Sequence, residues 1–359
     1  MMCARIGMVS GRGLAAAFKS KFPQPLLVLA ISALLAANTI NVGADLAGMA
    51  DAAELLTHIS SHTWVLVLAL GISIATVRLR YYQIAKTLKW LALALFAYVI
   101  SAFVIHPDWR AALHDTLIPS LPRGKQGWET VVAILGTTIS PYLFFWQAAQ
   151  EVEEEKTSGR NTLGQRKGAT TTEIRTRMFD VAIGTFFSNL VMYFIILTTA
   201  FTLHRHGITN VETSKDAANA LLPLAGRLAT TLYTVGIVGV GMLAIPTLTG
   251  SAAYAFAEAF AWRQGLDKKL QQARSFYAMI LLSTMAAVAL DFSKISPVKA
   301  LFWTAVINGV LAPFLLVGIL IVACDAKLCS GQTSSPLGRI VVGVTALAMF
   351  IAAIAMFLV

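Results

Sequence analysis

Nine long apolar segments, separated by polar linkers, constrain the fold of this chain more than any other feature of its sequence. A helix of about 20 apolar residues is long enough to cross the hydrocarbon core of a bilayer. Only 13% of the 359 residues are charged, about half the fraction found in soluble domains. The sequence therefore predicts an all-α polytopic membrane protein with a single transmembrane domain over residues 1–359. The predicted spans are 25–50, 63–79, 88–106, 130–150, 178–203, 228–261, 275–292, 299–323 and 337–359.

The distribution of lysine and arginine predicts the orientation of these spans. The basic residues behind the net charge of +10 lie in short loops between apolar spans, so the charge does not indicate a nucleic-acid partner. Assigned loop by loop, most of the 28 lysine and arginine residues fall on one side of the membrane, which is expected to be the cytoplasmic side. The N-terminus is then cytoplasmic, the C-terminus is outside, and residues 151–177 form a cytoplasmic loop.

The fourth predicted span contains an interruption that indicates a binding site. The interrupting residues are Gly136, Thr137, Thr138, Ile139, Ser140 and Pro141. Gly136 and Pro141 are expected to break the helix, because proline lacks the amide hydrogen that an inner turn requires. The freed carbonyls and the hydroxyls of Thr137 and Ser140 are oxygen ligands of the kind that hard cations prefer. The alternative is a proline kink whose carbonyls are satisfied by threonine hydroxyls, and both interpretations stay open.

Polar residues also lie inside the first and eighth predicted spans. Asn38, Asn41 and Asp45 have the spacing of residues on one helical face. A carboxylate at membrane depth is costly and indicates function, although Asp45 could instead be hydrogen-bonded near the outer end of its helix. Asn308 could face a cavity or form an interhelical hydrogen bond.

Acidic residues and cysteines elsewhere are interpreted as structural. The run Glu151–Glu155 is expected to be a solvated helix end at the cytoplasmic face. Glu258, near the cytoplasmic end of the sixth span, is expected to reach the membrane surface. The three cysteines, Cys3, Cys324 and Cys329, provide neither a disulfide framework nor a zinc site.

These residues resemble the NRAMP family of divalent metal transporters. The resemblance rests on Asn38–Leu46 with Gly48 and Met49, on Gly136–Tyr142, and on Gln147 and Glu151. It extends over essentially the whole chain and is closest to the bacterial branch related to magnesium transport. It implies the LeuT-like fold, in which two inverted repeats of five helices are followed by one more. In that register the chain carries helices three to eleven, Met2–Gly13 resembles the end of the second helix, and the first helix and most of the second are absent.

The resemblance also implies a ligand chemistry. Where the family's sixth helix has alanine, methionine, proline and histidine, this sequence has Thr137, Ser140, Pro141 and Tyr142. Loss of the thioether removes a ligand for softer metals, so Mg²⁺ or Mn²⁺ is expected at Thr137 and Ser140. The expected substrate path or proton route consists of Asn38, Asp45, Tyr142 and Asn308. Because Asn38 and Gly48 stand where the family has acidic residues, proton symport is expected to be weak or absent.

The first functional interpretation is divalent metal transport across the bacterial inner membrane by an N-terminally truncated chain. The missing first helix supplies half of the metal ligands in the family, so a separately encoded N-terminal two-helix fragment is a possible partner beside the lipid bilayer. The alternatives are a non-transporting remnant or an accessory subunit of a split transporter and, less favoured, an amino-acid permease of the same fold. Neither an enzymatic reaction nor a cofactor is expected, because no nucleophile–base pair and no nucleotide-binding motif appears.

Overall fold

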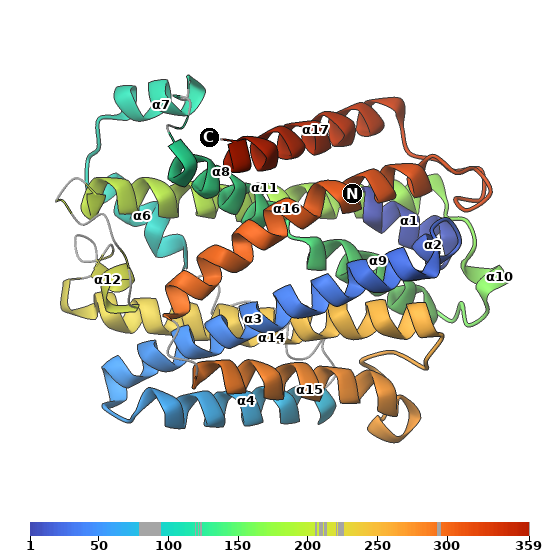
Figure 1. Cartoon of the computed structure of the whole chain (residues 1–359), viewed down its shortest axis with the longest axis horizontal. Coiled ribbons are helices and arrows are strands. Elements are labelled where there is room, and N and C mark those ends of the chain that lie inside the picture. The colour runs from blue at the N-terminus through green and yellow to red at the C-terminus, as the bar shows by residue number, and fades with distance from the viewer. Residues whose placement is uncertain are drawn as a thin grey trace.

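The computed structural model of this chain describes residues 1–358 except 79–94, 119, 121, 123, 205–206, 208–210, 212–213, 220, 222–225 and 293–295. The described residues form helices and loops without a strand, which confirms the all-α class (Figure 1). The α-helices are α1 (Met2–Ser10), α2 (Leu14–Lys19), α3 (Gln24–Thr57), α4 (Ser61–Arg78), α6 (Phe96–Val104), α7 (Trp109–Leu117), α8 (Gly124–Thr138), α9 (Pro141–Thr157), α10 (Leu163–Arg166), α11 (Thr171–Thr202), α12 (Ser214–Asn219), α14 (Ala229–Phe260), α15 (Arg274–Asp291), α16 (Pro297–Ala323) and α17 (Pro336–Leu358). Two short 3₁₀ helices, η3 (Gly226–Leu228) and η4 (Leu270–Gln272), complete the described elements.

Eight helical segments of the described chain are long and apolar enough to cross a membrane, with α8 and α9 counted together as Gly124–Thr157. Each falls on one of the predicted spans; of the remaining predicted span 88–106, residues 88–94 lie outside the described residues and the described part carries the short helix α6. The first long helix, α3, has 34 residues and runs beyond the predicted end at residue 50. A helix of that length is about 50 Å long, which exceeds the roughly 30 Å of a hydrocarbon core. Its last turns therefore extend toward the membrane surface.

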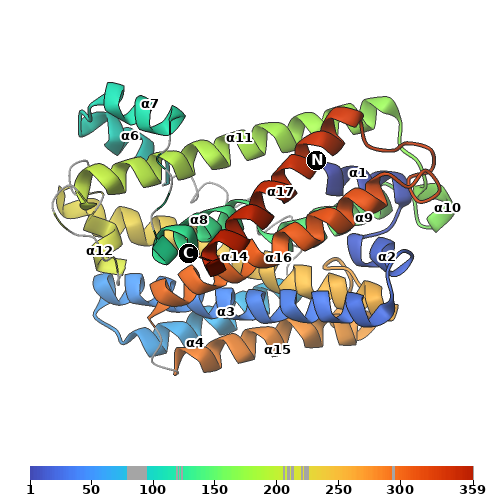
Figure 2. The ribbon, with the colours of Figure 1, turned by 45° about the horizontal axis from the view of Figure 1, so that its top comes forward.

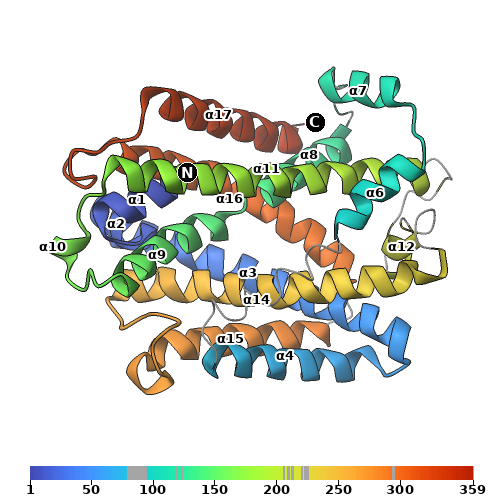
Figure 3. The ribbon, with the colours of Figure 1, turned by 180° about the vertical axis from the view of Figure 1, so that it is seen from behind.

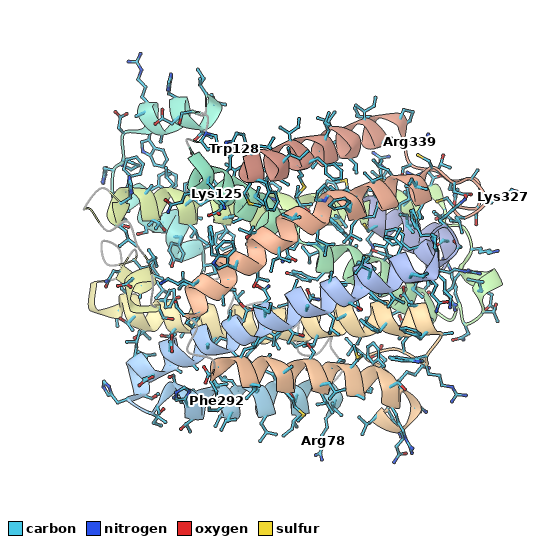
Figure 4. All side chains as sticks on the ribbon, in the orientation of Figure 1. Arg78, Lys125, Trp128, Phe292, Lys327 and Arg339 are labelled. Carbon is cyan, nitrogen blue, oxygen red and sulfur yellow. The ribbon has the colours of Figure 1, made fainter. Side chains whose placement is uncertain are left out.

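The two ends of the helix bundle differ. Helices α1, α2 and α10 and the loop between α16 and α17 gather at one end, whereas α6, α7 and α12 lie toward the other (Figures 1 and 3). Figure 4 places Lys327 and Arg339 at the first end and Lys125 away from it. Arg5 Nε of α1 donates to Gln332 O in the loop that carries Lys327, so basic residue groups that are distant in the sequence meet at the same end of the bundle.

The core is built around α3, which packs against α4, α14, α15 and α16. Glycines permit this close packing. An ideal Cβ on Gly43 would lie 2.9 Å from the carbonyl oxygen of Ala287 in α15, and one on Gly241 in α14 would lie 2.1 Å from Met49 Sδ. Small residues at such contacts let membrane helices pack backbone against backbone, where no hydrophobic force drives them together.

Glu258 has a different role from the one predicted. Its carboxylate accepts hydrogen bonds from the backbone amides of Ala15 (3.0 Å) and Ala16 (3.2 Å) in the first turn of α2. These amides have no partner inside their own helix, and an anion at a helix N-terminus is favourable. An ideal Cβ on Gly13 would lie 1.7 Å from Glu258 Oε1, so the glycine leaves room for the carboxylate. The expectation that Glu258 reaches the membrane surface is wrong, because α2 folds over it.

Helix α11 is the least covered of the long helices. It has the smallest buried share of the eight candidate spans and packs mainly against α6. Figure 2 shows it along the edge of the bundle, apart from α3, α4 and α15. Residues 183–189 are exposed, and Thr185, Ser188 and Asn189 are the polar ones among them. Since polar groups are costly in contact with hydrocarbon, this face of α11 is poorly suited to lipid.

Candidate functional site

The interruption predicted in the fourth span is present, but it is shorter than predicted. α8 continues through Gly136 and ends at Thr138, and α9 begins at Pro141. Ser140 is the N-cap of α9 and has an extended backbone (φ −72°, ψ 126°). Pro141 occupies the first position of α9, where an amide hydrogen would have no intrahelical partner. The break therefore falls on Ile139 and Ser140, which corrects the predicted position of its start.

The Ser140 side chain satisfies carbonyls that the interruption would otherwise leave open. Its Oγ donates to the carbonyl oxygens of Gly136 and Thr137, both at 2.9 Å. Thr138 Oγ1 donates in the same way to Ile134 O at 2.7 Å, while Thr137 is exposed. Hydroxyl and carbonyl oxygens each have two acceptor lone pairs, so these oxygens keep the capacity to ligate a cation. A kink whose carbonyls are satisfied by hydroxyl groups and a site that binds a cation are thus compatible interpretations of the interruption.

Gly136 itself serves helix packing. An ideal Cβ at this position would lie 2.0 Å from Ala305 O and 2.3 Å from Gly309 N in α16. Gly309 in turn faces α8, because its own ideal Cβ would lie 2.2 Å from Val132 O. The two glycines allow α8 and α16 to cross in backbone contact. This crossing holds the α8 side of the interruption in place.

Helix α9 begins against the core formed by α3 and α14. Tyr142 packs against a cluster that contains Val42 and Leu46 of α3 and Leu248 of α14. Val42 and Leu46 are close neighbours of Asp45 in the chain. The structure therefore brings the start of α9 next to the stretch of α3 that carries the predicted polar residues.

Asn38 forms a polar link between α3 and α14. Its side chain is 1% exposed, and its Nδ2 donates to Leu248 O and to Ser251 Oγ, both at 2.9 Å. Its Oδ1 is buried without a hydrogen-bond partner in the described part of the chain. A buried acceptor without a partner is destabilising, which makes this oxygen a candidate contact for a cation or a water molecule. Ser251 lies at the end of the proline- and glycine-containing stretch 245–251 of the sixth predicted span, but nothing in the sequence indicates that α14 meets α3 there.

Asp45 and Asn308 show the same lack of partners. Asp45 lies about 10 Å farther along α3 than Asn38, is half-buried, and forms neither a hydrogen bond nor an ion pair with the described residues. Asn308 in α16 is 4% exposed, and its Oδ1 has no hydrogen-bond partner among the residues that the structure describes. No described residue bonds to the Asp45 carboxylate or to Asn308 Oδ1. The described structure therefore does not explain either group by a structural hydrogen bond.

The acidic run at the end of α9 differs from the prediction. Glu151 and Glu155 are only 3% and 7% exposed, so these two carboxylates are not solvated, whereas Glu154 of the same run is exposed as predicted. Gln147, Glu151 and Glu155 are spaced four residues apart and share one face of the helix. Gln147 Nε2 donates to Glu151 Oε1 at 2.7 Å, and Arg177 Nε of α11 lies 2.9 Å from Glu151 Oε2. The spacing was a sequence signal for a buried face, but the partner helix could not be read from it.

The donor atoms at the interruption are oxygens. Across the described residues, no group of three or more His, Cys, Asp or Glu is placed to hold a metal ion. The atoms that could ligate at the interruption are the Ser140 hydroxyl and the carbonyls of Gly136 and Thr137. Hydroxyl and carbonyl oxygens suit Mg²⁺, Ca²⁺ and Mn²⁺ better than softer metals.

Curated relatives of this chain are transport proteins. The "Divalent metal cation transporter MntH" of Yersinia pestis (strain Pestoides F) is 25% identical over 260 residues, which cover 70% of this chain and 59% of the relative. The protein of the same name from Caldanaerobacter subterraneus subsp. tengcongensis is 23% identical over 251 residues, which cover 69% of this chain and 55% of the relative. The chain thus spans less than two thirds of the length of these relatives.

Solved structures show the same fold. A crystal structure of a mutant Eremococcus coleocola manganese transporter superposes with a TM-score of 0.66 at 18% identity, covering 98% of this chain and 75% of that chain. The same transporter in complex with an aromatic bis-isothiourea substituted compound gives a TM-score of 0.63 at 17% identity. These neighbours confirm the predicted LeuT-like fold.

The resemblance seen in the sequence is confirmed by a comparison with a family model. The "Natural resistance-associated macrophage protein-like" model matches residues 1–359, which is the whole chain. The interrupted helix between α8 and α9 and the polar stretch of α3 both lie inside this match. The chain belongs to the natural resistance-associated macrophage protein-like (NRAMP) family.

Proposed function

We propose that this chain carries most of a pathway for divalent metal cations across the membrane, with Mg²⁺ or Mn²⁺ favoured over softer metals. The main support for this proposal is the interruption between α8 and α9. There Ser140 Oγ donates to the carbonyl oxygens of Gly136 and Thr137, so three oxygen atoms lie close together. The relatives are named divalent metal cation transporters, and the neighbouring structures are of a manganese transporter. Accordingly, no enzymatic reaction and no cofactor are assigned to the chain.

The proposed roles follow the donor chemistry. Thr137 and Ser140 are the proposed metal ligands. Asn38, Asp45, Tyr142 and Asn308 line the proposed route of the cation or of protons. Oxygen donors favour hard cations, and Mg²⁺ reaches such sites with several of its waters retained. The cytoplasmic N-terminus and the location in a bacterial inner membrane remain part of the proposal, supported by the basic loops that meet at one end of the bundle.

Replacing Ser140 with methionine is expected to shift the binding preference toward softer metals, since a thioether is a soft ligand. We expect the ratio of Cd²⁺ to Mg²⁺ affinity to rise about tenfold, equivalent to roughly 1.4 kcal/mol. Isothermal titration calorimetry on the full chain with both metals measures this ratio. The matched control is Ser140→Ala, which removes the same hydroxyl without adding sulfur. Equal ratios in the two variants would contradict a metal position beside Ser140.

We also propose that a further transmembrane segment covers the open side of the interruption. A crevice of about 490 Å³ lies there, lined by Thr138 and Gln147 on one side and by Ser188 and Asn189 of α11 on the other. Met1 also lines the crevice, so the start of α1 lies at its edge. A helix in this position that carried polar groups toward α11 would pair with its hydroxyl and amide groups, which would otherwise meet hydrocarbon.

The intact mass of the protein isolated from its native membrane tests this proposal. A small hydrophobic polypeptide that co-purifies with a 38.5 kDa chain supports a separately encoded two-helix fragment. A single chain of larger mass supports a segment that is continuous with α1. Metal uptake by the 38.5 kDa chain alone in proteoliposomes would overturn the proposal, because the crevice would then need no cover.

A further inference from the structure

A second polar pocket lies at one end of the bundle, away from the interrupted helix. It opens between the end of α9, the start of α11 and α1, and its volume is about 400 Å³. Five carboxylates line it: Glu151, Glu154, Glu155, Glu173 and Asp180. Glu155 lies fifteen residues beyond Ser140, which is roughly 22 Å along the chain by helical rise. The pocket is therefore separate from the proposed metal ligands.

Two arginines balance part of this charge. Arg177 Nε lies 2.9 Å from Glu151 Oε2, and the same guanidinium also pairs with Glu154. Arg160 Nη2 lies 2.5 Å from Glu173 Oε1. Carboxylates outnumber guanidinium groups five to two in the lining, so the pocket keeps a negative charge.

Glu155 is the buried carboxylate of the lining that these pairs leave without a hydrogen bond among the described residues. It is 7% exposed, and neither of its oxygens has a hydrogen-bond partner among the described residues. Its ion pair with Arg160 is long, with 3.8 Å between Nη1 and Oε1, which is beyond hydrogen-bond distance. A buried carboxylate without hydrogen bonds is strongly destabilising, and a cation in the pocket would offset that cost.

The carboxylates are not arranged to coordinate a bare ion. Nowhere in the described ranges do three or more His, Cys, Asp or Glu converge closely enough to hold a metal directly. A cation here would therefore keep its water shell, as Mg²⁺ commonly does. The volume has room for this shell, since one water needs only about 10–15 Å³ of such volume.

We propose that this pocket is a second cation site, which holds a hydrated divalent cation through water-mediated contacts with the exposed carboxylates of the lining, while the buried charge of Glu155 attracts the cation without touching its water shell. The affinity of the pocket for the cation depends on the excess of carboxylates over guanidinium groups, and the cation binds whether or not the protein transports metal. Arg160 competes with the cation for Glu155, so its removal increases the affinity.

A titration with Mn²⁺ tests the site. Enhancement of water-proton relaxation reports Mn²⁺ that is protein-bound yet still carries exchanging waters, and it is measured on the full chain at low ionic strength. Relative to the wild type, Glu155→Gln is expected to weaken this binding about tenfold and Arg160→Gln to tighten it about tenfold, as a unit charge a few ångströms from a divalent ion implies. A misfolded protein would not bind more tightly, so the second variant keeps the test decisive.

Two matched controls separate the site from general charge effects. Glu153→Gln removes a carboxylate of the same helix that pairs with Lys156 and does not line the pocket. Arg175→Gln removes an exposed arginine of α11 that also lies outside the lining. Both are expected to change the Mn²⁺ affinity less than twofold. The proposal is overturned if Glu155→Gln binds as the wild type does, or if Arg160→Gln binds no more tightly than Arg175→Gln. Ser140→Ala is expected to keep the Glu155-dependent binding, which distinguishes this site from the interruption.

Discussion

Replacing Gly136 with alanine is expected to destabilise the folded protein strongly. The added Cβ would lie 2.0 Å from Ala305 O and 2.3 Å from Gly309 N, and both are backbone atoms that cannot turn away. The crossing of α8 and α16 would have to open, at a cost at or above the upper end of the about 1–3 kcal/mol usual for overpacking. Such a loss is a large part of the roughly 5–15 kcal/mol that stabilises a typical native state. The yield of monodisperse protein from membranes and its melting temperature in detergent measure the effect.

Gly71→Ala is the matched control for this substitution. Gly71 lies in α4, and no atom is within 4 Å of the Cβ that alanine would add. Alanine is favoured over glycine inside a helix by about 1 kcal/mol, so this variant is expected to melt at the wild-type temperature or slightly above it. Equal melting temperatures for the two variants would show that α8 and α16 do not cross in backbone contact.

Replacing Asp45 with asparagine is expected to reduce metal uptake strongly while leaving the fold intact. Asp45 forms no hydrogen bond and no ion pair with the described residues, so the substitution removes a charge without breaking a described contact. A charge inside a membrane helix costs about 3 kcal/mol, so the melting temperature is expected to stay the same or to rise. If the carboxylate faces the cation or proton route, uptake is expected to fall by about tenfold or more.

Proteoliposomes that contain the complete transporter and a pH-sensitive dye measure both consequences of this substitution. Weak acidification driven by Mn²⁺ is expected in the wild type, because Asn38 supplies an amide and not a carboxylate, and Asp45→Asn is expected to remove even that signal. Asp51→Asn is the control, since Asp51 lies nearer the end of the same helix. Wild-type uptake by Asp45→Asn would place Asp45 outside the route, and strong acidification in the wild type would contradict weak coupling.

The sequence located the helices well because of a property of the bilayer. Backbone groups in hydrocarbon must find partners within their own helix, so each span is a continuous apolar run that can be recognised locally. The span 228–261, for example, corresponds to α14 at 229–260. The motif at residues 136–142 was likewise local, and it sufficed to recognise the family. Within this motif, the structure differs from the prediction only in where the break begins. A proline is common at the first position of a helix, so its presence does not show where the preceding helix ends.

The tertiary structure decided everything that depends on a partner distant in the sequence. Glu258 caps a helix 243 residues away, and the charge of Glu151 is met by Arg177 from another helix. Gly136 is required by α16, which follows it by more than 150 residues. Local hydropathy reports how a residue interacts with lipid and water, whereas these roles depend on which helix packs beside it. The sequence by itself therefore determined the class and the family, and the packing of helices determined which carboxylates are buried.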